Sequence, residues 1–361
     1  MDLEKVPAVV IGAGVVGCAI AQRLATSGLS PLVLESGPRI AEGVTSRNSG
    51  VIHAGLYYPP NSLKATSCIR GKELLVNWCK KNNVPWQNTG KWIVAQAGQE
   101  EALEDLFRNA QNSKASGLTR KSKQQLAEAL PMVRGTEALF SSETGIVDAY
   151  AFSRSLLFSA EENGAMTILS AKVLGIEVLA SFDFLLETTK GKIRTERVYN
   201  AAGLACDEVA KLAGVDKYKI YPWRGDYFRI KRDLGIRTLV YPARKKNAPG
   251  LGVHLTIELD GHSKLGPDVE FGLDKENFRP REEKRDRFWE AAQAFLPDLK
   301  KEDLQYDTCG LRPKLRSETD KAEHDFIVSE DLPGFTNFIG IESPGLTSAM
   351  ALAERLTLTA R

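Results

Sequence analysis

The sequence predicts an α/β protein with a Rossmann-like dinucleotide-binding domain and a second, α+β domain that contains a mainly antiparallel sheet. Three observations lead to this fold class. A glycine-rich turn joins an apolar run to a helical pattern over residues 9–25, and a second strand, glycine turn and helix follow at residues 197–212. From Tyr221 onward, aromatic and β-forming runs alternate with turn residues.

The first glycine-rich turn has the sequence Gly-x-Gly-x-x-Gly at residues 12–17. A strand that ends in such a turn and opens a helix lays a pyrophosphate on the helix N-terminus, where free N–H groups and the helix dipole favour negative charge. Gly12 permits the turn, Gly14 lets the backbone approach the phosphates, and Gly17 lets the helix pack close to the strand. The less favoured alternative is an ordinary βαβ crossover.

A second apolar run, at residues 31–34, ends in Glu35. This is near the offset expected for a carboxylate that binds an adenosine ribose. No basic residue lies beside Glu35, so the pattern favours an unmodified ribose diol. FAD and NAD fit this pattern, whereas NADP does not.

Composition limits the class of protein. A chain of 361 residues is long enough for two domains, and a net charge of +2 argues against a nucleic-acid partner. Five cysteines without a Cys-x-x-Cys pair indicate free thiols in a reducing compartment and argue against a metal site or a disulfide framework. No apolar stretch is long enough to span a membrane. The first strand begins close to Met1, so we expect a cytoplasmic protein, or a mitochondrial one if a leader precedes this sequence.

Periodicity and turn residues place the remaining elements. We expect a turn at residues 143–148, a final helix after residues 342–347, and helices at residues 63–81, 100–115, 124–130, 151–163, 207–212 and 281–295. We expect strands at residues 92–95, 173–178, 182–188, 197–200, 223–230, 239–242, 251–257, 326–328 and 335–341. Residues 45–58 instead combine glycine and small polar residues with His53, Tyr57 and Tyr58, which is typical of backbone that wraps a ligand.

The motifs together resemble the L-2-hydroxyglutarate dehydrogenase family, within the larger glycine oxidase and D-amino-acid oxidase-like class of flavoproteins. The resemblance runs in order through residues 10–17, 48–58, 63–65, 90–95, 200–203, 224–227, 251–256, 265–267 and 342–347. Residues 243–247 and the sequence Pro313-Lys314-Leu315 depart from the family pattern.

The resemblance implies FAD, bound in extended form, and oxidation of a small L-2-hydroxy acid to a 2-oxo acid, with L-2-hydroxyglutarate as the best guess. It implies a discontinuous FAD-binding domain of residues 1–88, 142–220 and 305–361, and a substrate-binding domain of residues 89–141 and 221–304. An amine or amino-acid oxidase of the same fold, or a flavin-binding protein without turnover, is the alternative. The electron acceptor is left open among oxygen, a quinone and an electron carrier.

Matching the motifs assigns residues to the two ligands. The expected FAD-binding residues are Gly12, Gly14, Val15, Val16, Gly17, Glu35, Ser36, Ser46, Asn48, Ser49, Gly50, Val173, Ala202, Gly203, Arg312, Pro344, Gly345, Leu346 and Thr347. The expected substrate residues are Tyr57, Tyr58, Arg224, His254 and Ser343, and the expected catalytic residues are His254, His53 and Arg224.

The histidines suit proton transfer because imidazole titrates near neutrality. We favour His254 as the proton acceptor, since alternation along a strand at residues 251–256 would turn Gly252, His254 and Thr256 to one face. His53 would instead touch the flavin ring. Arg224 and Arg312 are candidates for binding a carboxylate, because a guanidinium presents a planar fork. The alternative for Arg224 is a structural ion pair with Asp226.

Overall fold

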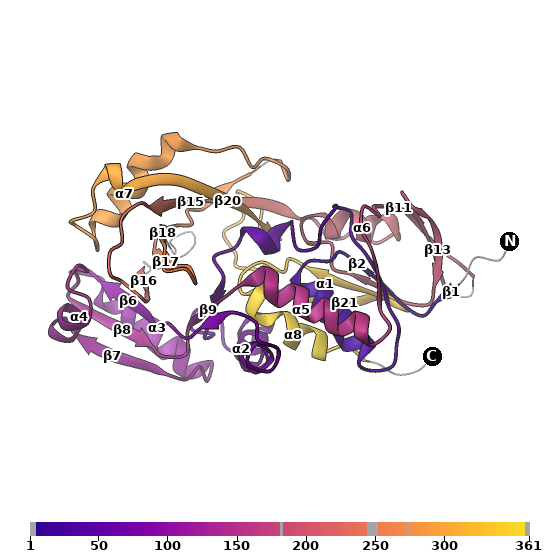
Figure 1. The fold of residues 1–361 in the computed structure, drawn as a ribbon, viewed down its shortest axis with the longest axis horizontal. Helices are drawn as coiled ribbons and strands as arrows, with labels where there is room; N and C mark the ends of the chain where they lie inside the picture. The colour runs from indigo at the N-terminus through magenta and orange to yellow at the C-terminus, as the bar shows by residue number, and fades with distance from the viewer. Residues whose placement is uncertain (1–4, 181–182, 244–251, 273, 358–361) are drawn as a thin grey trace.

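In a computed structural model, which describes residues 5–180, 183–243, 252–272 and 274–357, a six-stranded sheet forms the middle layer of one half of the molecule (Figure 1). Its strand order is β10-β3-β2-β14-β22-β21. The strands are β2 (Val9–Ile11), β3 (Leu32–Leu34), β10 (Met166–Ile168), β14 (Val198–Asn200), β21 (Ile327–Leu332) and β22 (Phe335–Ile339). All neighbours are parallel except β21 and β22, which confirms the Rossmann-like prediction.

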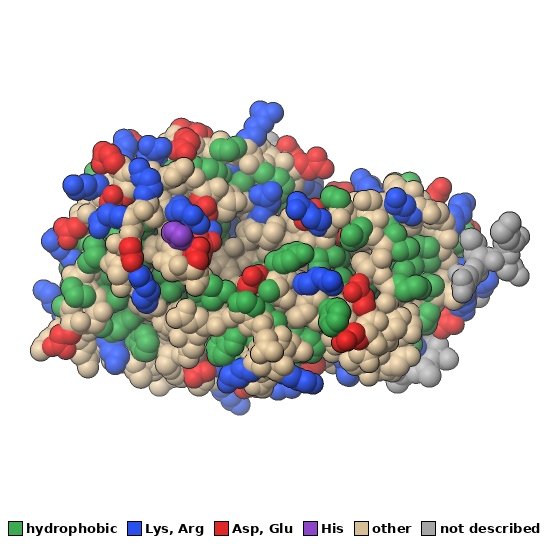
Figure 2. All heavy atoms as spheres, viewed as in Figure 1, with side chains coloured by type: hydrophobic (Ala, Val, Ile, Leu, Met, Phe, Trp, Pro, Cys, Tyr) green, Lys and Arg blue, Asp and Glu red, His purple; other side chains and the backbone are tan. Residues whose placement is uncertain are grey.

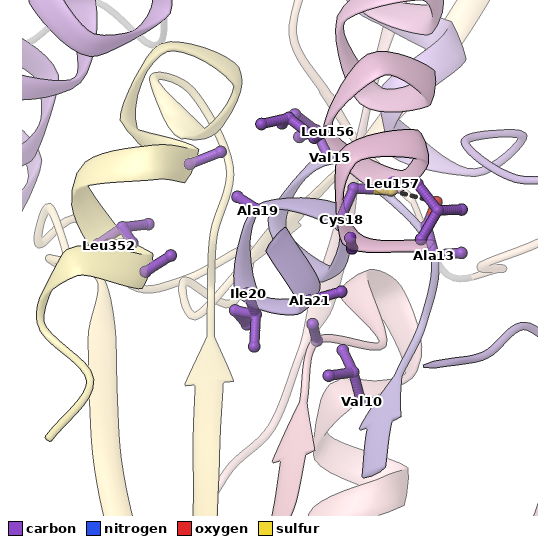
Figure 3. Packing of buried hydrophobic residues seen from close by; sticks show 14 of the residues in the cluster. Val10, Ala13, Val15, Cys18, Ala19, Ile20, Ala21, Leu156, Leu157 and Leu352 are labelled. Atoms are coloured by element: carbon purple, nitrogen blue, oxygen red, sulfur yellow. Dashed lines mark hydrogen bonds between the residues drawn. The ribbon is translucent and has the colours of Figure 1, made fainter. Parts of the chain in front are cut away.

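The central strands β2, β3 and β14 are buried along their whole length, as expected for a parallel sheet that is covered on both faces. Helices α1 (Val15–Ala25), α5 (Ala149–Glu162) and α8 (Gly345–Glu354) cover one face. A four-stranded sheet of β1 (Lys5–Val6), β13 (Gly191–Thr195), β12 (Phe184–Thr188) and β11 (Val173–Val178) covers the other face. Val10 therefore packs under α1 (Figure 3), whereas its neighbours Val9 and Ile11 pack towards Phe184.

Two further helices and a small sheet complete this half. Helix α2 (Leu63–Asn82) packs along α8, and α6 (Cys206–Leu212) follows β14. The hydroxyl of Ser62 accepts a hydrogen bond from the N–H of Ala65 and so caps α2. Strands β4 (Val51–Ile52), β9 (Gly145–Val147) and β5 (Trp86–Gln87) form the small sheet, and 3₁₀ turns lie at η1 (Val44–Arg47) and η2 (Gly203–Ala205).

The other half, at the left in Figure 1, is built on a nine-stranded sheet. Its strands are β6 (Lys91–Ala95), β7 (Leu118–Ser122), β8 (Glu137–Ser141), β15 (Tyr221–Ile230), β16 (Leu239–Pro242), β17 (Leu255–Ile257), β18 (Ser263–Leu265), β19 (Glu270–Phe271) and β20 (Leu304–Lys314). Neighbours are antiparallel except β16 and β6, which confirms the mainly antiparallel sheet.

Helices cover both faces of this sheet as well. They are α3 (Glu100–Asn112), α4 (Lys123–Ala129) and α7 (Arg285–Gln293), with 3₁₀ turns η3 (Glu282–Lys284) and η4 (Lys301–Asp303). Along β6 the side chains alternate between two cores. Trp92 and Val94 pack with Phe288 of α7, whereas Ile93 and Ala95 pack with Leu103 of α3.

The structure differs from the predicted elements at several places, and strands β7, β8, β10, β13 and β18, for example, were not expected. The strand expected at residues 251–257 begins only at Leu255, because Gly252 has a φ of +75° and turns the chain; Leu251 lies outside the described residues. The turn expected at residues 143–148 contains strand β9. Strand β20 was not predicted, and it pairs with β15 along its length. Strand β20 begins at Leu304, next to the predicted domain boundary at residue 305. The division of the chain into two domains remains a prediction.

Charged side chains of both signs are interspersed over the face in Figure 2, in keeping with the small net charge. Within the described ranges, no helix is long and apolar enough to cross a membrane.

Candidate active site

A cavity of about 820 Å³ lies between the two halves. We call it the central cavity. Its volume is at the upper end of the usual range for ligand sites. Most of the residues predicted from the motifs lie on its wall. They are Gly12, Gly14, Val15, Val16, Glu35, Ser36, Asn48, Ser49, His53, Tyr57, Tyr58, Val173, Ala202, Gly203, His254, Arg312, Ser343, Pro344, Gly345 and Leu346.

The glycine-rich turn forms part of this wall at the N-terminus of α1. Gly12 has a φ of +101°, and a Cβ there would lie 2.6 Å from the carbonyl oxygen of Ala201. A Cβ at Gly17 would lie 1.8 Å from the carbonyl oxygen of Gly12, so α1 packs directly on the turn. This is the close approach that the spacing predicts. The turn and the α1 N-terminus thus form a backbone surface suited to a pyrophosphate.

Glu35 lies on the wall at the end of β3. One carboxylate oxygen accepts a hydrogen bond from the N–H of Ala13 at 2.8 Å, and the other accepts one from the N–H of Gly37 at 2.8 Å. The N–H of Ala171 donates to the carbonyl of Glu35 and brings Val173, also on the wall, beside it. The carboxylate is therefore fixed at the cavity next to the glycine-rich turn, as a ribose-binding residue requires.

Four predicted cofactor residues do not line the central cavity: Gly17, Ser46, Gly50 and Thr347. The Ser46 hydroxyl donates to the carbonyl of Glu42 at 2.8 Å. The Thr347 hydroxyl accepts a hydrogen bond from the N–H of His53 at 3.0 Å. Thr347 therefore supports the loop that holds His53. It was expected to bind the cofactor, but it does not line the cavity.

His254, also on the wall, is 4% exposed, and its Nδ1 lies 2.8 Å from the carbonyl oxygen of Gly252. A carbonyl can only accept, so Nδ1 carries the proton and Nε2 is the proton-accepting nitrogen of the neutral ring. Burial lowers the pKa of His254 to about 3, and the charges of Lys91 and Arg312 act in the same direction. The imidazole is thus uncharged at neutral pH.

His53 forms a second neutral imidazole in this part of the cavity. Its Nε2 lies 3.3 Å from the hydroxyl of Ser343, which also bonds to Tyr58. Its buried Nδ1 has no hydrogen-bond partner among the described residues. Burial lowers the pKa of His53 to about 3, with Lys91 and His254 contributing. An unsatisfied buried nitrogen beside the cavity leaves a hydrogen-bond position for a ligand.

Arg224 does not line the central cavity, and its assignment to the substrate is wrong. Its guanidinium is 2% exposed and bonds to the carboxylate of Asp226 at 2.6 to 3.1 Å. It also donates to the carbonyls of Asn277 and Arg279, at 2.7 and 2.6 Å. Because its donors are used within the protein, Arg224 is structural, which was the alternative for this residue.

Arg312 on β20 does line the central cavity. Its hydrogen bonds are long, at 3.3 to 3.4 Å, and go to the carbonyls of Arg224 and Asp268. It forms no ion pair with a carboxylate in the part of the chain that is described. A guanidinium without a carboxylate partner at a cavity wall is able to bind one from a ligand.

Sequence reasoning missed Lys91, which begins strand β6. It is fully buried, and its Nζ has no hydrogen-bond partner within the described ranges. The Nζ lies 4.7 Å from the ring centre of Tyr57 and 4.8 Å from that of Tyr241, and Tyr241 stacks on His254. Burial lowers the pKa of Lys91 to about 7. The apolar residues 92–95 that follow Lys91 were the one signal in the sequence that this lysine is buried.

Comparisons with known proteins agree with this geometry. The family model described as DAO, FAD dependent oxidoreductase, matches residues 8–358. The mitochondrial L-2-hydroxyglutarate dehydrogenase of Arabidopsis thaliana is 35% identical over 407 residues, covering 98% of this chain and 83% of that protein. The glycerol 3-phosphate dehydrogenase of Caloramator mitchellensis is 31% identical over 351 residues, covering 95% of this chain and 71% of that protein. L-alpha-glycerophosphate oxidase from Mycoplasma pneumoniae, solved with FAD bound, has a TM-score of 0.90 at 26% identity, covering 98% and 94%.

Proposed function

The chain belongs to the DAO family of FAD-dependent oxidoreductases, and we propose that it oxidises a small L-2-hydroxy acid to the 2-oxo acid. The observation that carries the proposal is that a neutral imidazole, His254, and a guanidinium whose charge acts on it, Arg312, both line the central cavity. One can accept a proton and the other can bind a carboxylate. The names of the relatives favour L-2-hydroxyglutarate as the acid.

The residues of the cavity fit FAD. We propose that Gly12 and Gly14 bind its pyrophosphate and that Glu35 binds its adenosine ribose. Gly345 and Leu346 open helix α8 and line the cavity together with Ser343 and Pro344. A helix N-terminus favours a partial negative charge, so we assign it to the pyrimidine end of the flavin.

Bound FAD would supply the acceptor for a hydride from the carbon that bears the hydroxyl group. The protein then has to orient the acid and take the hydroxyl proton. Arg312 would bind the carboxylate next to that carbon, and Nε2 of His254 would take the proton. Because burial disfavours imidazolium at His254, proton transfer depends on a nearby negative charge, which the bound substrate supplies.

An anaerobic substrate screen tests this proposal. Flavin absorbance is followed with L-2-hydroxyglutarate, an L-amino acid and glycerol 3-phosphate in parallel. We expect bleaching by the hydroxy acid, with conversion to the 2-oxo acid. Bleaching by the amino acid alone supports an amino-acid oxidase, and bleaching by glycerol 3-phosphate alone supports the activity named for two of the similar proteins. Either outcome contradicts the proposal.

The compartment and the electron acceptor belong to the same proposal. The five cysteines are all buried and free, which supports a reducing compartment. We propose the cytoplasm, with the mitochondrion as the alternative that the names of the relatives suggest. Oxygen uptake measured beside the reduction of a quinone analogue identifies the electron acceptor.

A further inference from the structure

Two lysines share one carboxylate at the wall of the central cavity. The Nζ of Lys64 lies 2.9 Å from Glu342, and the Nζ of Lys314 lies 2.8 Å from the same carboxylate. The three side chains are 12%, 22% and 11% exposed, in the order Lys64, Lys314 and Glu342. They come from the start of α2, the end of β20 and the loop before α8. We call them the lysine pair and its carboxylate.

This cluster carries one positive charge in excess. Burial acts to raise the pKa of Glu342, but the charges of Lys314 and Lys64 outweigh it and hold that pKa below its usual value, so Glu342 is ionised. Burial also lowers the pKa of Lys314, despite the carboxylate beside it. An excess charge that is withdrawn from water is costly, and a ligand with negative charge would remove that cost.

Asp325, an acidic side chain on the same wall, is hydrogen-bonded to backbone N–H groups. Asp325 accepts hydrogen bonds from the N–H groups of Leu63 and Lys64, at 2.5 and 2.8 Å. It also accepts one from the N–H of Phe326 at 2.8 Å. Its oxygens are thus directed at the backbone at the N-terminus of α2, where a carboxylate is stabilised by the helix dipole.

Strand geometry places the lysine pair beside the residue that we assign to the substrate. Arg312 and Lys314 are two residues apart on β20, so their side chains point to the same face, about 7 Å apart along the strand. Both line the central cavity, as does Lys64. A ligand that bound Arg312 through one acid group could therefore reach the lysine pair with a second acid group.

We propose that Lys64 and Lys314 bind the second acid group of the substrate and select dicarboxylic over monocarboxylic 2-hydroxy acids. This inference rests on the proposed function. The alternative is a purely structural role, in which the cluster only joins α2, β20 and the loop before α8. The two roles predict different effects when one lysine is removed. If the lysine binds substrate, the activity with the dicarboxylic acid falls more than the activity with the monocarboxylic acid; if it is structural, both activities change equally.

The test compares two acids of equal length in four enzymes. The acids are L-2-hydroxyglutarate and L-2-hydroxypentanoate, which has a methyl group in place of the second carboxylate. The enzymes are the wild type, Lys314→Met, Lys314→Arg and Lys190→Met. Lys190 is exposed in the turn between β12 and β13, so its variant is a charge-matched control. Lys314→Met leaves Lys64 and Glu342 as a neutral pair, and bound FAD, measured by absorbance, reports its folding.

We expect Lys314→Met to lower the ratio of kcat/KM for the two acids by about 10- to 100-fold, the range for losing one charge-assisted hydrogen bond. Lys314→Arg keeps the charge and should restore most of the preference, while Lys190→Met should match the wild type. An unchanged ratio in Lys314→Met, or a wild type that uses both acids equally, overturns the inference and leaves the proposed function standing.

A binding measurement separates this inference from the reaction itself. Glutarate and pentanoate lack the hydroxyl group, so neither can be oxidised, and their affinities for the FAD-loaded enzyme can be measured by calorimetry. We expect wild type to bind glutarate at least tenfold more tightly than pentanoate, and Lys64→Met or Lys314→Met to lose this difference. Equal affinities in the wild type contradict the inference. If the preference is present but no 2-hydroxy acid is oxidised, the proposed function fails and the acid-binding site stands.

Discussion

The imidazole of His254 stacks on the phenol ring of Tyr241, with ring centres 3.7 Å apart and planes inclined by 23°. The hydrogen bond from Nδ1 to the carbonyl of Gly252 fixes the rotation of the ring within its plane. The position and the tautomer of His254 are therefore both set before any ligand binds, which is the preorganisation that a general base requires.

Replacing this base should slow the chemistry and spare the cofactor. We expect His254→Ala to reduce flavin reduction by about a hundredfold or more, the range for a positioned general base, with FAD still bound. His53→Ala is the matched variant at the second imidazole, and it should disturb flavin absorbance or retention at least as much as rate. Stopped-flow reduction tests both. Normal reduction in His254→Ala, with loss in His53→Ala and an intact flavin spectrum, would exchange the two roles.

Lys91→Met should stabilise the protein at low pH. The pKa of Lys91 is about 7 in the fold against an ordinary value of 10.5, so between these values the unfolded chain binds more protons and stability rises with pH. Below pH 7 Lys91 is protonated in the folded protein, so burial of its charge lowers the free energy of unfolding by the full amount. Each pKa unit corresponds to about 1.4 kcal/mol, so methionine should raise the Tm by several degrees at pH 6 and much less at pH 10. A pH-independent change in Tm argues against a buried charge.

Lysine substitutions at the two arginines should separate fold from function. Arg224→Lys leaves the carbonyls of Asn277 and Arg279 without their donors, so we expect a loss of about 2 kcal/mol or more in unfolding free energy, with the KM unchanged. Arg312→Lys should keep the Tm and lower kcat/KM by about tenfold or more, because lysine cannot make a bidentate contact. Urea denaturation and steady-state kinetics on both variants test these expectations. An unchanged stability with a raised KM in Arg224→Lys would instead indicate that Arg224 binds the substrate.

A branched side chain in the glycine-rich turn should remove the cofactor. Gly14 precedes α1 and lines the central cavity, and a Cβ there would lie 3.2 Å from the hydroxyl of Thr45, beside the turn that we assign to the pyrophosphate. We expect purified Gly14→Val to be folded and colourless, whereas Glu35→Ala should lose FAD less severely. Gly175→Val is the control, since a Cβ there meets only ordinary contacts. Stoichiometric FAD in Gly14→Val would contradict the assignment.

The fold was predictable where local patterns decide it. Helix α2 was expected at residues 63–81 and spans Leu63–Asn82, because a serine cap and a regular apolar spacing define it. Strand β20 was missed because Gly310 and Pro313 are unfavourable in strands. In the structure, pairing with β15 from Tyr221 to Ile230 supplies the hydrogen bonds that hold β20 extended. Such long-range pairing leaves no local signal in the sequence.

The cavity was predictable in outline and less so in detail. The motifs assigned His53, His254 and Arg312 to the two ligands, and all three line the central cavity. They could not separate Arg224 from Arg312, since both are arginines within two residues of a glycine, whereas in the structure Arg224 is bound to Asp226 and Arg312 lines the cavity. Lys91 was missed because a lysine at the start of a strand is usually solvated, and its burial depends on Tyr57 and Tyr241 from distant segments.

The most direct test of the central claim is a single anaerobic turnover with L-2-hydroxyglutarate. Enzyme with a known content of FAD is mixed with excess acid, flavin absorbance is followed, and the quenched mixture is analysed for 2-oxoglutarate. We expect the flavin to be bleached fully with one 2-oxoglutarate formed per FAD, and the D-enantiomer to cause no bleaching. Flavin that stays oxidised with the L-acid, or bleaching without formation of the 2-oxo acid, would contradict the assignment of this chain as an L-2-hydroxy-acid oxidoreductase.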